Sequence, residues 1–237
     1  MTATRRRLAM RRLAGGLLLA AALTGCASSR SWSYTPEPRG AAIDPLANVS
    51  VIVLPFEDRR LNENSNFIMI YLIPLVPFGW ATYHTPEGVQ MHVNSGLWQF
   101  RPADDFARAV AQELENARIF RETFVGNRAS DADYVLLGEI ASTKYEGRLI
   151  SYGLSAYGPL LWFFGFPSST TSNELTLTLK LAKTPSTPAI WTHTIRGEAS
   201  AVSWIYAIQP DFTYDQLLKQ GLREAITSLA ATARTLK

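Results

Sequence analysis

The sequence predicts an α+β fold in which a mixed, mostly antiparallel β-sheet is covered by two main helices. Three observations lead to this class. Residues 49–56 and 134–140 are apolar on both faces, as in strands buried inside a sheet. Residues 174–181 alternate leucine with threonine and lysine, as in a strand with one wet face. Apolar residues at helical spacing appear in 102–120 and again from Tyr214 onward.

The chain begins with a complete lipoprotein signal peptide, residues 1–25. Its first twelve residues hold five arginines and no acid, and eleven residues rich in leucine and alanine follow. Eleven residues are too few to span a bilayer, which takes about 20, but they suit the apolar core of an export signal. The motif L-T-G-C then forms a lipobox, which predicts cleavage between Gly25 and Cys26 and a lipid on the Cys26 sulfur. The arginine pairs leave open whether export uses the general or the twin-arginine route.

Removal of the leader changes the charge balance. The chain has 23 basic and 20 acidic residues, and the leader takes five of the basic ones, which leaves 18 against 20. The basic character of the whole chain therefore gives no support for a nucleic-acid partner. The single cysteine is the predicted lipid acceptor, so no disulfide is expected and the fold must depend on core burial.

Residues 26–48 form the predicted lipidated tether. The segment contains several serines and prolines and lacks apolar periodicity, which favours extended and solvated chain. Ala27 follows the cysteine, at the position where an aspartate is the inner-membrane retention signal of enterobacterial lipoproteins. For a Gram-negative host this predicts a protein anchored in the outer membrane. Its single mixed α/β domain, residues 49–237, would then face the periplasm.

The remaining elements follow from local patterns. The helix predicted over 102–120 has two aspartates in its first turn, where they favour the helix dipole. A proline-rich loop joins the strand at 174–181 to a second strand at 190–196, so the two are expected to pair as an antiparallel hairpin. Thr213 and Gln216 match a capping box at the start of the last helix.

Two aromatic blocks, residues 67–80 and 152–167, interrupt this pattern. Both are broken by proline or glycine, and the first is too short to cross a bilayer. Such blocks either enlarge the core or form an exposed surface that docks a partner, a second copy or the membrane. We expect the first block to pack on the sheet and the second to be exposed. The candidate interaction patch consists of Phe67, Ile70, Trp80, Leu160, Trp162, Phe163 and Phe164.

No recognised catalytic motif is present: the sequence has no G-x-S-x-G, no P-loop and no H-E-x-x-H. His84, Glu87 and His92 could supply metal ligands, but their spacing matches no zinc pattern and P-E-G around Glu87 indicates a turn. His193 alternates with apolar residues on a predicted strand, where a packed histidine is expected rather than a base. We therefore expect no enzyme, no metal site and no cofactor.

Four segments carry a family resemblance: V-I-V-L-P-F (51–56), E-L-E-N-A-R-I-F (113–120), A-D-Y-V-L-L-G-E-I (132–140), and L-T-L-K-L followed by I-W-T (177–192). Together they resemble a superfamily of bacterial envelope lipoproteins. Its members are built like the curli-secretion channel CsgG, the N-terminal domain of TolB and the outer-membrane lipoprotein that activates penicillin-binding proteins. The resemblance implies the same fold over residues 49–237. Because this fold serves as pore subunit, docking module and enzyme activator, it does not choose a function.

These observations predict a lipid-anchored, non-catalytic envelope protein. We expect it to act by protein–protein contact, with an envelope partner or by self-association, in outer-membrane or cell-envelope assembly and maintenance. The alternative is a subunit of an oligomeric CsgG-like secretion channel. Channel hairpins need strands of about 9–11 residues that alternate apolar and polar, and neither aromatic block alternates.

Overall fold

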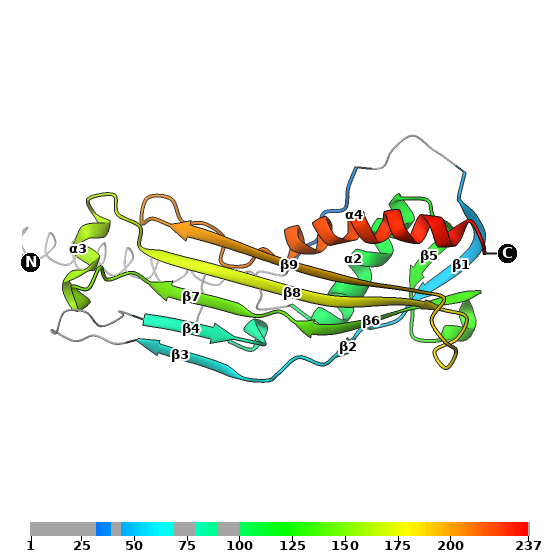
Figure 1. Ribbon diagram of the computed structural model, residues 1–237, viewed down its shortest axis with the longest axis horizontal. Helices are drawn as coiled ribbons and strands as arrows, with labels where there is room; N and C mark the ends of the chain where they lie inside the picture. The colour runs from blue at the N-terminus through cyan, green and yellow to red at the C-terminus, as the bar shows by residue number, and fades with distance from the viewer. Residues whose placement is uncertain (1–31, 39–43, 69–78, 90–99, 237) are drawn as a thin grey trace, which may run out of the picture. The chain divides into compact units, whose positions relative to one another are not determined.

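The computed structural model describes residues 32–38, 44–68, 79–89 and 100–236. The predicted signal peptide with its cleavage site, Gly25 and Cys26, lies outside the described residues, as do Ile70 and His92. The described residues form an α+β domain built on one open sheet of nine strands (Figure 1). In chain order the elements are β1 (Ala47–Val53), β2 (Glu57–Asp58), β3 (Asn64–Ile68), β4 (Gly79–Tyr83), η2 (Pro86–Gly88), α2 (Pro102–Asn116), β5 (Phe120–Val125), η3 (Ala129–Asp131), β6 (Tyr134–Ser142), β7 (Tyr145–Leu149), η4 (Ser155–Tyr157), α3 (Pro159–Trp162), β8 (Ser169–Ala182), β9 (Trp191–Ser203) and α4 (Tyr214–Ala233).

The longest strands of the sheet are β8 and β9, which pair with each other. They pair antiparallel from Ser169 opposite Ser203 to Leu181 opposite Trp191, which confirms the predicted hairpin and lengthens both strands. β8 also pairs with β7 along its first part and with β6 along its second part, so the sheet has two halves. β7, β4 and β3 continue one half in antiparallel pairing, whereas β6, β1 and β5 pair parallel in the other. The predicted mixed, mostly antiparallel sheet is confirmed.

The two main helices, α2 and α4, cover one face of the half that contains the parallel strands (Figure 1). Their apolar stripes are spaced as the sequence predicts and meet the leucines of β8, because alternate residues of a strand point to the same face. No helix among the described residues has the length and hydropathy needed to cross a membrane. The side chains that form this contact, all at most 3% exposed, are Phe106, Val110 and Leu114 of α2, Leu218, Leu222 and Leu229 of α4, and Leu175, Leu177, Leu179 and Leu181 of β8.

Helix α2 is shorter than the predicted 102–120. It ends at Asn116 because Arg118 takes a positive φ of 52°, and Phe120 already begins β5. Glycine usually supplies a positive φ at the end of a helix, so an arginine there gives no sequence signal. β5 pairs parallel with β1, and the sequence did not predict it.

The capping box predicted for α4 does not form. The Thr213 side chain makes no cap hydrogen bond. Instead, the backbone N–H groups of Gln216 and Leu217 donate to the Thr213 carbonyl oxygen. The motif therefore predicted the start of the helix correctly, but the Thr213 backbone carbonyl, and not its side chain, accepts the hydrogen bonds there.

Residues 32–38 differ from the solvated chain expected for 26–48. They have no regular secondary structure, yet the Trp32 ring packs against two rings of the core. Its centroid lies 5.3 Å from that of Phe100 and 5.7 Å from that of Phe106. This part of the predicted tether is therefore bound to the domain.

Polar contacts attach the same segment to α2. The Glu113 carboxylate is buried, and its Oε1 accepts hydrogen bonds from the Tyr34 hydroxyl at 2.6 Å and from the Glu37 backbone N–H at 2.9 Å. Asn116 donates its side-chain amide to the Glu37 carbonyl oxygen at 3.0 Å. Burial and the bond to Glu113 raise the pKa of Tyr34 far above its ordinary value, so the phenol stays protonated and continues to donate.

Candidate functional site

Three neighbouring strands of the antiparallel half, β7, β8 and β9, have one end at the same level of the sheet. There Leu149 pairs with Ser169, and Ser169 pairs with Ser203, and we call these three paired residues the row. The connections 150–168 and 204–210 therefore leave the sheet at the same end, on the left in Figure 1. Neither connection contains Asp, Glu, Lys, Arg or His. We call these two connections the uncharged end.

The longer connection has a closed framework. The Trp162 Nε1–H donates to the Ile150 carbonyl oxygen at 2.8 Å, which ties α3 back to the point where the chain leaves β7. Gly158 lies directly on the backbone of Ser151, where a Cβ would collide with it. The glycine that interrupts this block in the sequence thus permits a close approach of two backbone segments.

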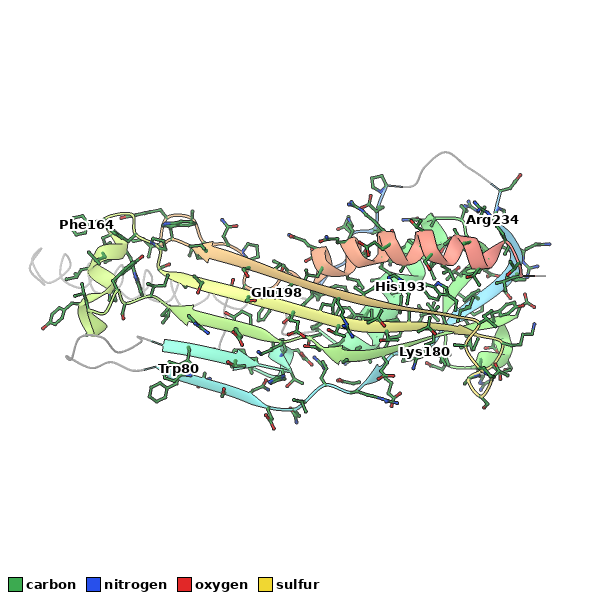
Figure 2. The ribbon with its side chains drawn as sticks, in the orientation of Figure 1. Trp80, Phe164, Lys180, His193, Glu198 and Arg234 are labelled. Carbon is green, nitrogen blue, oxygen red and sulfur yellow. The ribbon has the colours of Figure 1, made fainter. Side chains whose placement is uncertain are left out.

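The large apolar side chains of this connection are exposed. Phe164 is 79% exposed, Phe163 65% and Leu160 58%. Figure 2 shows Phe164 at the end of the sheet, far from the helices α2 and α4. The exposure predicted for residues 152–167 is confirmed, and four members of the candidate patch, including the half-buried Trp162, gather here. Their docking role stays a prediction.

The shorter connection lies against the longer one. The Tyr206 hydroxyl donates to the Phe163 carbonyl oxygen at 3.1 Å, and the Ser168 backbone N–H donates to the Ser203 carbonyl oxygen at 2.8 Å. Tyr206 and Ile208 are themselves 71% and 65% exposed. The two connections are therefore joined, and both carry exposed apolar side chains.

The remaining described members of the candidate patch lie elsewhere. Phe67 and Trp80 are partners across β3 and β4, with ring centroids 4.6 Å apart and each residue 39% exposed. Trp80 also lies opposite Arg148 of β7, on the face of the sheet that α2 and α4 do not cover. Packing into the core, as expected for residues 67–80, is therefore wrong for these two rings. They pack on each other at the sheet surface.

A groove of about 270 Å³ lies beside the uncharged end. Its floor consists of small residues on adjacent strands, chiefly Ala81, Gly147 and Thr171, and Tyr83 and Tyr145 close it on one side. The two tyrosine rings stack at 5.6 Å between centroids. The charged residues in its lining are Arg148 and Asp211.

The most buried ion pair of the described residues is structural. The Arg60 guanidinium, whose side chain is only 3% exposed, contacts Asp58 at 2.7 Å and Glu87 at 2.5 Å, and it donates to the Thr143 hydroxyl at 2.6 Å. This joins the chain after β2 to η2 and to the end of β6. The hydrogen bond from Arg60 holds the pKa of Asp58 below its ordinary value. Since the guanidinium is already satisfied by protein groups, the cluster offers no free site for a substrate.

Of the two histidines that the sequence raised as ligands, His84 is described and His92 lies outside the described residues. The His84 carbonyl oxygen accepts a hydrogen bond from Thr143, and the His193 ring stacks on Trp191 with centroids 5.9 Å apart. No group of three or more His, Cys, Asp or Glu side chains suited to a metal occurs among the residues that the structure describes.

Sequence reasoning missed the shorter connection, 204–210. It is W-I-Y-A-I-Q-P, which has neither helical nor strand periodicity, so pattern analysis passed over it. Its lack of charge between Glu198 and Asp211 was the available signal. Only the pairing of β8 with β9 shows that it meets residues 150–168.

Fold and surface together define a class: an α+β domain with one exposed, uncharged end. No family model and no curated protein matches the sequence. Among solved structures, the chain is similar to protein XCC0632 from Xanthomonas campestris, of the DUF330 family, with 15% identity and a TM-score of 0.44 over 84% of this chain and 97% of that one. It is also similar to PelC from Paraburkholderia phytofirmans, solved as a dodecamer (10%, 0.37, 86% and 96%), and to a homolog of neuraminyllactose-binding hemagglutinin from Helicobacter pylori (11%, 0.37, 85% and 90%). At these values the likenesses carry no argument about function, and the resemblance to CsgG and TolB stays a prediction.

Proposed function

We propose that this chain is a lipid-anchored protein of the bacterial cell envelope that acts by docking rather than by catalysis. The observation that carries the docking is the uncharged end, where Leu160, Phe163, Phe164, Tyr206 and Ile208 are all more than half exposed. Contiguous apolar surface of this kind is uncommon on a monomer and usually marks an interaction site.

The anchor is supported by the sequence. The lipobox places Cys26 directly after an export signal, and this cysteine is the only one in the chain. Ala27 supports the outer membrane as the destination and the periplasm as the side on which the domain lies. Envelope assembly or maintenance, with an envelope partner or a second copy, is the process in which a docking protein at that place would act.

The non-catalytic part of the proposal is supported by how the charged groups are used. Arg60, Asp58 and Glu87 satisfy one another, and Glu113 accepts two hydrogen bonds from the segment 32–38. Catalytic acids and bases are instead expected in a cleft, with side chains left available to substrate.

The anchor is tested by Cys26→Ala. The substitution removes the only thiol that can accept a lipid, so incorporation of labelled fatty acid should be lost and any exported protein should leave the membrane fraction. Wild-type protein should stay in the membrane through a high-salt wash, since multiple acyl chains anchor stably. Labelled fatty acid on the Cys26→Ala protein, or its full retention in the membrane pellet, would refute the anchor.

A further inference from the structure

We infer that the uncharged end inserts its apolar side chains into the surface of a lipid bilayer, as a second membrane contact of the domain. This inference deepens the proposed function and rests on it, because the lipid on Cys26 is what keeps the domain at a membrane. Three observations favour a bilayer over a protein partner.

The first observation is the complete absence of charge. No Asp, Glu, Lys, Arg or His occurs between Arg148 and Glu174, or between Glu198 and Asp211. Protein interfaces have a polar rim and are enriched in arginine, whereas a surface that enters lipid must exclude charge.

The opposite end of the sheet provides the contrast. There the connection 126–133 carries Arg128, Asp131 and Asp133, and the turn between β8 and β9 begins with Lys183 (Figure 1). β8 and β9 run from one end of the sheet to the other, so the uncharged end and the turn that begins with Lys183 are built on the same two strands. The connection 126–133, which joins β5 to β6, adds further charges at the opposite end.

The second observation is that eight backbone N–H groups of the longer connection donate to carbonyl oxygens of the uncharged end or of Ser203 beside it. In lipid no water replaces a missing partner, so polar backbone groups must be paired within the protein. The Tyr152 hydroxyl is also paired, because it donates to the Pro167 carbonyl oxygen at 2.8 Å. Backbone N–H groups that donate to carbonyl oxygens within the uncharged end, or to Ser203 beside it, are those of Ile150, Leu154, Tyr157, Leu161, Phe164, Gly165, Phe166 and Ser168.

The third observation is the kind of side chain and its position. Leu160, Phe163 and Phe164 of the longer connection are exposed, and so are Tyr157 and Tyr206 of the same two connections. Tyrosine and tryptophan are the residues enriched where a protein crosses from lipid to water. Arg148, whose side chain is 73% exposed, lies one position inside the row, where it can meet anionic head groups.

The test uses the acylated full-length protein and its lack of other cysteines. Acylation consumes Cys26, so a cysteine introduced elsewhere is the only free thiol. We would place an environment-sensitive fluorophore on Phe164→Cys, and on Ser186→Cys as the matched control in the turn at the opposite end. Both positions are exposed, so neither substitution should lower the unfolding temperature appreciably. The proteins are then bound to vesicles of phosphatidylethanolamine and phosphatidylglycerol, with and without acyl-chain spin labels.

At Phe164→Cys we expect emission to shift to shorter wavelength on the vesicles and to lose most of its intensity when the lipids carry spin labels. At Ser186→Cys we expect neither change. Equal responses at both positions, or none at Phe164→Cys in vesicle-bound protein, would refute the inference. An emission shift that requires high protein concentration would refute the bilayer as the binding partner and indicate a second copy of the chain instead. An emission shift seen only in native membranes would also refute the bilayer and indicate an envelope protein as the binding partner.

Titration of free thiols in the wild type separates failure of the anchor from failure of this inference. An acylated chain has no free thiol. One free thiol, with no binding to vesicles, would overturn the proposed anchor and the membrane contact with it. A vesicle-bound chain without a free thiol, and without a response at Phe164→Cys, would overturn the membrane contact alone.

Discussion

Truncation of Phe163 should hardly change the stability of the protein. The residue is 65% exposed, so only about a third of its surface leaves water on folding. Full burial of a phenylalanine side chain contributes about 1.5–3 kcal/mol, so Phe163→Ala should cost about 0.5–1 kcal/mol. In a domain of this size that lowers the Tm by roughly 1–4 °C. The hydrogen bond from Tyr206 goes to the backbone carbonyl oxygen of Phe163 and survives the change.

The matched control is Phe106→Ala on α2. Phe106 is fully buried and its ring contacts those of Trp32 and Phe100. Removing such a ring leaves a cavity and costs about 3–5 kcal/mol, which corresponds to a loss of roughly 6–20 °C in Tm. Thermal unfolding of both variants, followed by circular dichroism, compares them directly. Equal losses would mean that Phe163 is buried in the protein and that the uncharged end is not a free surface.

Two other substitutions test the contacts that stabilise the domain. Asp58→Asn should lower the free energy of unfolding by about 1 kcal/mol at neutral pH, because it removes one charge partner of the buried Arg60. Since the folded pKa of Asp58 lies below its ordinary value, the carboxylate stabilises the fold above about pH 4 and loses this effect as pH falls through the folded pKa. The wild type and Asp58→Asn should therefore converge in acid, and a difference that stays constant across a pH series of urea unfolding curves would contradict the role of the charge. Trp32→Ala should lower stability by about 1–3 kcal/mol and speed proteolysis within residues 32–38, and an unchanged proteolytic pattern would show that this segment is not held by its ring.

The parts of the fold that the sequence predicted are those whose signal is local and periodic. Alternation along β8 and helical spacing in α4 each reflect one face packed on the core, and both elements lie where expected. β5 gave no such signal. Its sequence, F-R-E-T-F-V, has apolar residues only at its first and last two positions, and the turn before it depends on a positive φ at Arg118. Parallel pairing with β1 stabilises this strand, and that partner is distant in sequence.

The candidate surface was predicted in part for a related reason. Leu160 to Phe166 is apolar all round, so one covering surface could not bury it, and its exposure could be predicted from the sequence alone. The position of Phe67 and Trp80 could not be predicted in this way. The two rings lie on neighbouring strands and pack against each other on the face of the sheet that the helices do not cover. The contribution of Tyr206 depended on strand register, which brings residues 150–168 and 204–210 to the same row.

The attachment of residues 32–38 to α2 sets how far the domain can stand from its anchor. A free tether from Cys26 to the start of β1 at Ala47 could extend about 70 Å, at roughly 3.5 Å per residue. With Trp32 bound to the core, only six residue steps separate the proposed lipid from the domain, a reach of about 20 Å. The domain then samples a thin layer at the membrane surface, where its effective concentration toward anything in that layer is high. A partner located elsewhere in the envelope would have to come to the membrane to be met.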